Sequence, residues 1–412
     1  MSRLYPAILA LSLPAIAGAQ APIPIRKVGP ILATSIENVG RAVTVRATAS
    51  GHVIVGAGSR QRVYAFDSTL KNFTLVADSG SGTGSGLSRP IGLIPFLGDS
   101  TLLPDLVANA LLVLDGTGKQ VRSMAPPRTQ DLQFLVSPVT SGRPVLDPKG
   151  RLIYKGALGK AQPPKMTPPG KTIELSPTNP DSAPIVRGDF DTRRIDTLAW
   201  MKTPNQGRVG QQLIPNPGGG PPSMTVHLQV NPFAVADEWS LLNDGTIAIV
   251  RVHDYHIDWI DPDGTTRSSP KMPIDWRKYT DAERLQVADS LRRFVEESSK
   301  RNLAARPAGN APIKMEVSVV PDSEFPTFWP PVMAGSVLSD LDGHVWILPA
   351  TSTNAANGLT YDVVNRKGEI IERVQLPQGC VLVGFGPRKM VYMTKAVGNN
   401  TYLTRALLDA RR

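Results

Sequence analysis

Two adjacent acidic residues followed by a tryptophan are the side chains whose types and spacing best suit chemistry in this sequence. The segment ADEWS, residues 236–240, contains Asp237, Glu238 and Trp239. Two carboxyl groups held close together can bind a cation, and crowding raises the pKa of one of them so that it can act as a general base. In the structural alternative, Trp239 fills the core between sheets and the acids cap the loop that enters the strand.

A second candidate is the histidine pair in RVHDYHID, residues 251–258. His253 and His256 have the spacing of zinc ligands on a helix, but residues three apart on a strand point to opposite faces. We expect strands here, so a shared metal would require a turn at Asp254. His344 follows an Asp-Gly pair, and we expect it to be exposed.

Local catalytic motifs are absent from the sequence. It contains no Gly-x-Ser-x-Gly, His-Glu-x-x-His or phosphate-loop pattern. The glycine-rich segment 79–88 is interpreted as a flexible loop, because no Lys-Ser/Thr ending follows it. The segment IDPDGTT resembles the start of a calcium loop, but the twelfth position counted from Asp261 is Met272 and not glutamate. Cys380 begins an apolar run and is expected to be buried.

The elements that must position these residues form a repeat. A corner of small residues is followed by an apolar run six times, with intervals of 48, 51, 95, 98 and 44 residues between successive corners. Intervals near 48 residues are typical of a four-stranded propeller blade. The corners lie at Gly51, Asp99, Gly150, Gly245, Gly343 and Pro387.

The two long intervals predict insertions. Proline-rich stretches at about 155–190 and 206–223 are interpreted as loop excursions, because each proline removes a donor from a strand ladder. A third insertion at about 274–312 contains a predicted helix over 280–301, with a capping box formed by Thr280 and Glu283. Its apolar stripe is expected to lie on the body while Arg284, Arg292 and Glu296 face away; the stripe consists of Leu285, Ala288, Leu291 and Val295. This arithmetic predicts six blades, with eight as the alternative.

Asp-Gly pairs provide the tight turns inside such blades, because glycine tolerates positive φ. Asp244, Asp263 and Asp342 are therefore interpreted as turn residues. The last repeat offers three strands where four are expected, so residues 25–36 are predicted to pair as its outermost strand and close the ring.

The N-terminus carries Arg3, an apolar stretch and a small-residue site, which predicts a signal peptide over 1–19 that is cleaved near Ala19. We therefore expect a periplasmic or secreted protein with a single propeller domain over 20–412. The stretch is too short to span a bilayer comfortably, and the single Cys380 cannot form an intramolecular disulfide. The net charge of +10 is dispersed along the chain, which argues against nucleic acid as a partner.

Three segments carry a family resemblance: 233–250, 255–264 and 325–348. The chain resembles secreted bacterial six-bladed β-propellers of the NHL-like and TolB-like kind. This resemblance implies an all-β fold, here with one amphipathic helical insertion and Pro/Gly-rich loops. In the wider group, functions range from protein-binding platforms and ligand sensors to lactone-cleaving or lyase-type enzymes, and fold alone cannot choose among them.

The predicted ligand site is a rim around the axial opening of the propeller. Phe328 and Trp329 are expected to occupy the position of Trp239 one repeat later, which predicts an aromatic rim. The rim residues are Asp105, Asp237, Glu238, Trp239, Phe328 and Trp329.

Two functions are carried forward. The first is an exported monomeric binding or scaffold module for a peptide, glycan or envelope partner, which needs no cofactor. The alternative is a metal-dependent hydrolase or lyase of the lactonase-like kind. The resemblance implies that such an enzyme holds a divalent cation such as calcium with side chains from several blades. Asp105 and Asp237 are the candidate carboxylates, but no complete site transfers to this sequence.

Overall fold

The computed structural model describes residues 23–58, 60–78, 92–136, 142–157, 166–168, 170–177, 180–203, 207–215, 223–304, 313–354 and 357–408. The predicted signal peptide and the glycine-rich segment 79–88 lie outside these ranges. None of the helices described is both long and apolar enough to cross a membrane.

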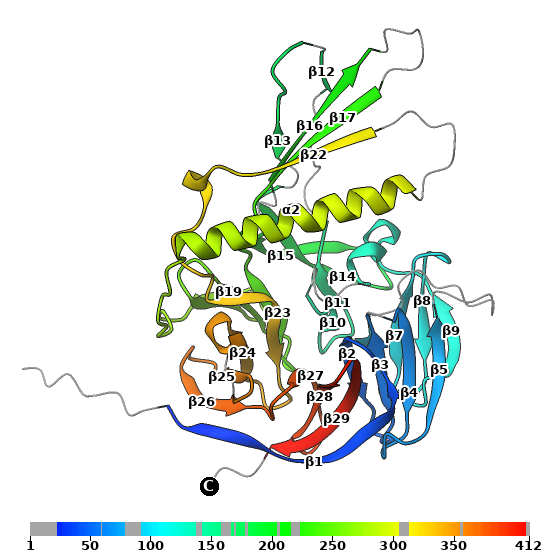
Figure 1. The fold of residues 1–412 in the computed structure, drawn as a ribbon. Coiled ribbons are helices and arrows are strands. Elements are labelled where there is room, and N and C mark those ends of the chain that lie inside the picture. Colours follow the sequence, from blue (N-terminus) through cyan, green and yellow to red (C-terminus); the bar gives the residue numbers. More distant parts are fainter. Residues whose placement is uncertain are drawn as a thin grey trace, which may run out of the picture.

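Most of the described chain folds into antiparallel sheets of short strands in a propeller-like arrangement (Figure 1). Four of these sheets have four strands each. The first sheet contains β2 (Ala42–Ala47), β3 (Val53–Ala57), β4 (Arg62–Phe66) and β5 (Phe73–Asp78). The second sheet contains β6 (Ile94–Pro95), β7 (Thr101–Asp105), β8 (Ala110–Leu114) and β9 (Gln120–Met124). The third sheet contains β10 (Val145–Leu146), β11 (Leu152–Lys155), β14 (Ser182–Gly188) and β15 (Ile195–Lys202). The fourth sheet contains β18 (Glu238–Leu241), β19 (Ile247–Arg251), β20 (His256–Ile260) and β21 (Thr266–Ser268).

The C-terminal part of the chain forms an eight-stranded sheet in which β1 lies between two antiparallel runs. One run contains β23 (Val332–Ser339), β24 (Val345–Pro349), β25 (Thr360–Val364) and β26 (Ile370–Gln375). The other contains β27 (Cys380–Gly386), β28 (Met390–Val397) and β29 (Asn400–Leu408), and β1 spans Ile25–Asn38.

The predicted corners are confirmed as turns between the first and second strands of these runs. The six corner residues follow β2, β6, β10, β18, β23 and β27 in turn. Gly245 and Gly343 have φ of 89° and 84°, which only glycine adopts without strain. Asp244 and Asp263 each accept a hydrogen bond from the backbone N–H two residues on, as expected of turn residues.

Hydrophobic clusters join each run of strands to the next. One cluster packs Leu103 and Leu114 of the second sheet on Ile54 and Val63 of the first. The clusters continue through the third and fourth sheets and both halves of the eight-stranded sheet, and one of them returns to the first sheet. This packing arises because each sheet is apolar on both faces and must be covered by a neighbour.

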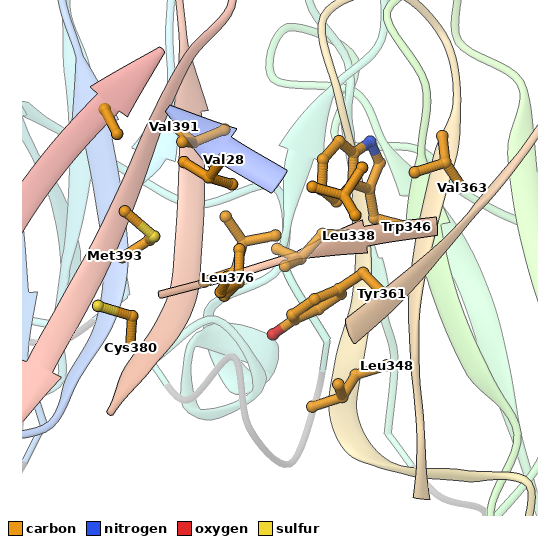
Figure 2. Close-up of a cluster of buried hydrophobic side chains, with 13 residues drawn as sticks. Val28, Leu338, Trp346, Leu348, Tyr361, Val363, Leu376, Cys380, Val391 and Met393 are labelled. Carbon is orange, nitrogen blue, oxygen red and sulfur yellow. The ribbon is translucent and has the colours of Figure 1, made fainter. Parts of the chain in front are cut away.

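Strand β1 closes this circuit, as predicted. Residues 28–38 of β1 pair antiparallel with β29, and Ile25–Lys27 pair in parallel with β26, a contact that the sequence did not predict. Figure 2 shows Val28 of β1 next to Val391 and Met393 on one side of a cluster that also contains Trp346 and Tyr361. The N-terminal strand therefore shares a core with the last part of the chain.

The insertions build a further sheet of their own, the accessory sheet, instead of loop excursions. It contains β12 (Met166–Thr167), β13 (Ser176–Pro177), β16 (Gly207–Ile214), β17 (Ser223–Val230) and β22 (Ile313–Val319). Figure 1 shows it projecting from the propeller-like body. The loop prediction for 206–223 is wrong because β16 and β17 pair along eight residues each. The range 155–190 is also too long, because β14, including Pro184, belongs to the third sheet.

Pro184 is tolerated in a central strand because of its position in the ladder. The ladder between β11 and β14 ends at the pair Lys155 and Ile185, one residue before Pro184 is reached. Its carbonyl still accepts a hydrogen bond from the N–H of Gly156. The missing N–H therefore removes no bond of that ladder.

The predicted helix is present as α2 (Asp281–Ala304), and its capping box is confirmed. The N–H of Glu283 donates to the Thr280 hydroxyl, and the Thr280 N–H and hydroxyl donate to the Glu283 carboxylate. The predicted stripe is wrong at Leu285, which is 66% exposed, whereas Arg284 is partly buried and donates to the Pro326 carbonyl. Ala288 and Leu291 of the stripe are partly buried, as predicted, and α2 packs against β22 of the accessory sheet.

Candidate functional site

Glu238 is the predicted site residue whose surroundings suit chemistry. It is the first residue of β18, directly after the insertion that contains β16 and β17, and it is half-buried. Its carboxylate accepts a hydrogen bond from the N–H of Gly335 in β23 at 2.9 Å. Further along the same strands, the Ser240 and Ser339 hydroxyls lie 3.0 Å apart. β18 and β23 thus run side by side and hold Glu238 between two sheets.

The pKa of Glu238 is raised to about 7, mainly by burial, and the neighbouring charge of Asp237 contributes in the same direction. The hydrogen bond from Gly335 and the charge of Lys155 act in the opposite direction but do not cancel the effect of burial. A carboxyl group with such a pKa exists in both protonation states near neutral pH. This is the property expected of a general acid or base, or of a group that changes ligand affinity with pH.

Lys155 is the basic partner of Glu238. It is the last residue of β11, directly before the insertion that contains β12 and β13. Burial lowers its pKa, and the charge of Glu238 partly restores it. The two groups therefore come from two sheets, and their charges influence each other near the points where insertions leave both sheets.

Arg143 is a further basic residue in the segment before β10. It directly follows Gly142, which lies so close to the Trp239 indole that an added Cβ would be 2.1 Å from Nε1. The Arg143 guanidinium donates to the carbonyl of Val383 in β27 at 2.8 Å, and burial lowers its pKa to about 10. Arg143 thus connects the segment before β10 with the first strand of the last run. Lys155, Glu238 and Gly335 are called the Glu238 site below.

Asp237 has a structural role. Its buried carboxylate accepts the N–H groups of Lys202 and Val252 and binds the Arg251 guanidinium at 2.7 Å. These partners come from β15 and from the end of β19, so Asp237 joins the third and fourth sheets. The alternative interpretation of this segment, in which the acids and Trp239 have structural roles, therefore describes Asp237 well. Trp239 likewise lies in a buried cluster.

The prediction that Phe328 and Trp329 occupy the position of Trp239 one repeat later is wrong. Both residues precede β23, whereas Trp239 lies within β18, so the positions are not equivalent. Phe328 forms a bridge with Lys278, and Trp329 stacks on Tyr279 with ring centroids 4.5 Å apart. The two aromatic residues therefore anchor the segment that leads into α2.

Asp105 lies apart from the other predicted rim residues. It ends β7, the second strand of its sheet, and its carboxylate accepts the N–H groups of Val107 and Ala108 in the following turn. Its side chain lines a groove between the first and second sheets.

The sequence did not predict Lys155, Gly335 and Arg143, because no local motif marks them and their sheets approach only in the folded chain.

The histidine pair does not lie entirely on strands, contrary to the expectation, because residues 252–255 form a turn. His253 is exposed in this turn, and His256 begins β20 with its Nε2 3.3 Å from Asp258. His344, expected to be exposed, is partly buried and lies 3.0 Å from Asp340. Cys380 is buried, as predicted, and burial raises its pKa.

Within the described ranges, one group of three His or Asp side chains lies close enough to share a metal: Asp340, Asp342 and His344. It occupies the turn after β23, at the opposite end of that strand from the Glu238 site. Burial would raise the pKa of Asp340, but hydrogen bonds from His344 and Trp346 lower it overall. The carboxylate oxygens of Asp340 are thus already used by the turn.

The Glu238 site does not fit the divalent cation of the lactonase-like alternative. Lys155 supplies a positive charge next to Glu238, and Asp237 is already bonded to three donors. Calcium requires six to eight oxygen ligands, which these residues do not provide. No step of a metal mechanism is therefore assigned to them.

No family model matches the chain, and no curated protein is significantly similar to it. Among solved structures, it is similar to a gluconolactonase from Xanthomonas campestris, with 10% identity, a TM-score of 0.40, and coverage of 92% of this chain and 98% of that chain. It is also similar to the calcium-binding protein regucalcin from Agrobacterium tumefaciens, with 12% identity, a TM-score of 0.40, and coverage of 94% and 99%. A virginiamycin B lyase from Staphylococcus aureus gives 11% identity, a TM-score of 0.37, and coverage of 89% and 81%. Similarity at this level carries no argument about activity.

Proposed function

We propose that the protein is an exported six-bladed β-propeller that binds a carboxylate-bearing ligand, such as an acidic glycan or peptide, at the Glu238 site. In this proposal, the eight-stranded sheet counts as two blades that share β1. The export rests on the predicted signal peptide, and the blade count rests on the six corners and on the clusters that link the runs into a circuit.

The observation that carries the proposal is that Glu238, held by the Gly335 N–H between two sheets, feels the charge of Lys155 from a third strand run where the insertions leave the sheets. In a ring of six, β10 and β27 face each other across the axis, so the contact between Arg143 and Val383 spans the axial channel. The ligand would meet the cationic side chain of Lys155 and a carboxyl group that is mostly neutral below pH 7. Cationic groups in a partly buried position favour a carboxylate partner.

The sign of the pH dependence follows from Glu238. Above its pKa of about 7, the Glu238 carboxylate is negative and repels an anionic ligand; below it, the neutral carboxyl group does not. Affinity for a carboxylate ligand should therefore rise as the pH falls from 8 to 5. A change of one full charge at short range in a partly buried site should alter affinity by about tenfold.

The experiment is calorimetric titration with trigalacturonate and with a glutamate-rich hexapeptide, at pH 5 and pH 8. Glu238→Gln keeps the hydrogen-bond acceptor for Gly335 but removes the charge, so it should bind equally well at both pH values. Lys155→Gln should weaken binding by roughly tenfold, and the matched control Lys149→Gln, in an exposed turn, should not. Binding by neither probe, or equal loss in both lysine variants, would refute the proposal.

An enzyme of the hydrolase or lyase kind is the second candidate, and one specific observation favours it. The pKa of a carboxyl group is raised and that of an amine beside it is lowered, which is how proton-transferring pairs are tuned toward neutral pH. Chromatography of the trigalacturonate sample after incubation would detect cleavage. Products formed by the wild type and not by Glu238→Gln would favour the enzyme over the binding module.

A further inference from the structure

A groove of about 930 Å³ lies between the first and second sheets, away from the Glu238 site. One end is lined by His52 and by Asp67 and Asn72 of the turn between β4 and β5. The other end is lined by Asp105 and Ala108 at the end of β7. The groove therefore follows the whole length of the strands.

Small side chains keep this groove open. The hydrophobic cluster between the first two sheets has no aromatic member, whereas each of the other five clusters of the described chain contains at least one Trp or Tyr. Ala65 and Ala77 face the groove from the first sheet, and Ala110 and Ser123 face it from the second. A close-packed interior would fill such space with larger side chains, so the gap is a feature of these two sheets.

The groove meets the two sheets in different ways. From the second sheet, Ala110, Leu112 and Leu114 line it, every other residue of β8, which means that β8 presents one face. From the first sheet, all residues from Phe73 to Ala77 line it, which means that β5 presents its edge. β5 is the last strand of its sheet, so its outer N–H and C=O groups pair with no strand among the residues that the structure describes.

Asp105 gives one end of the groove a negative charge. Only one of its carboxylate oxygens takes the N–H groups of Val107 and Ala108, at 2.8 and 3.1 Å. Asp105 forms no ion pair with any basic side chain in the described part of the chain, and it lies at the end of the groove toward which β5 runs. A strand that enters antiparallel to β5 would place its N-terminal end beside this carboxylate.

We infer that this groove binds an extended peptide segment of a partner protein, which adds as a strand antiparallel to the edge of β5. Its alternate aliphatic side chains would pack on Leu75 of β5 and Leu112 of β8, and a basic group at its N-terminal end would pair with Asp105. The site is separate from the Glu238 site and does not depend on the function proposed there.

The test uses heptapeptides that begin with lysine, continue with alternating valine and threonine, and carry a fluorescent label at the C-terminus. Their binding to the full chain is measured by fluorescence anisotropy. Ser123→Trp fills the groove from an exposed position of β9 and should weaken binding at least tenfold. Val121→Trp is the matched control, because Val121 lies on the same strand, is 56% exposed and does not line the groove. It should bind within twofold of the wild type.

Two further comparisons separate strand addition from simple apolar contact. A peptide with N-methylated backbone nitrogens at alternate positions cannot form the ladder and should lose binding. Asp105→Asn keeps the acceptor for the turn and removes the charge; it should weaken the lysine-led peptide about tenfold and leave an acetylated, neutral-ended peptide unchanged. Failure of all lysine-led peptides to bind wild type, equal binding of the N-methylated peptide, or equal effects of both tryptophan variants would overturn the inference.

Discussion

At the scale of single residues, Asp237 and Glu238 show how adjacent side chains of the same type acquire different roles. Asp237 is buried against two backbone N–H groups and Arg251, so its charge is satisfied and it joins two sheets. Glu238 accepts a hydrogen bond from Gly335, and its pKa is raised to about 7, mainly by burial. Their neighbours in space, and not their positions in the sequence, decide which of them can act on a ligand.

Gly142 provides a residue-scale prediction. Its φ of 73° and its close approach to the Trp239 indole mean that Gly142→Ala suffers both backbone strain and a clash. Gly150→Ala is the matched control, because Gly150 has a φ of 76° but open space where a Cβ would lie. We expect Gly150→Ala to lower the free energy of unfolding by about 1 kcal/mol and Gly142→Ala by about 3 kcal/mol, measured by urea denaturation. Equal decreases in the free energy of unfolding for the two variants would mean that the Trp239 side chain moves away and accommodates the added methyl group.

At the scale of elements, α2 shows that helix ends are easier to predict than helix faces. The capping box uses two residues three positions apart, and its hydrogen bonds form within the segment itself. The covered face depends on β22, which begins only at Ile313 and lies in another element. Thr280 and Glu283 were therefore predicted correctly, whereas within the face the prediction failed at Arg284 and Leu285 and held at Ala288 and Leu291.

Thr280→Ala should destabilise the first turn of α2 by about 1 kcal/mol, because the Glu283 N–H loses its acceptor. Hydrogen exchange of the backbone amides of residues 282–286 should become about fivefold faster. Ser290→Ala, at an exposed position within α2, serves as the control and should leave these rates unchanged. Similar exchange in both variants would show that packing against β22, and not the cap, stabilises this turn.

At the scale of the whole molecule, the circuit of sheets depends on β1. This strand pairs with both β29 and β26, and its Val28 lies in a cluster that contains residues from both halves of the eight-stranded sheet. The accessory sheet is a second long-range assembly, since its strands come from three separate insertions. Both assemblies join segments that are far apart in the chain.

Deletion of residues 20–36 should therefore destabilise the complete body and not only its first strand. We expect the melting temperature to fall by about 5–10 °C, because the removed segment covers a shared core and leaves the edge of β29 unpaired. Circular dichroism during heating would measure it, with a truncation of residues 20–22 alone as the control. If the longer deletion melts with the control, β1 does not stabilise the circuit.

The turns, the strand repeats, the helix cap and the closing strand could all be predicted from the amino-acid sequence. These features depend on residues that are neighbours in the chain or on a spacing that recurs, such as the glycines at the corners and the pattern of apolar runs. The accessory sheet, the electrostatic interaction of Lys155 with Glu238, and the groove beside β5 became visible only in the folded chain. Each of these depends on which faces and edges of distant strands come together, and that is set by packing across the whole chain and not by local propensity.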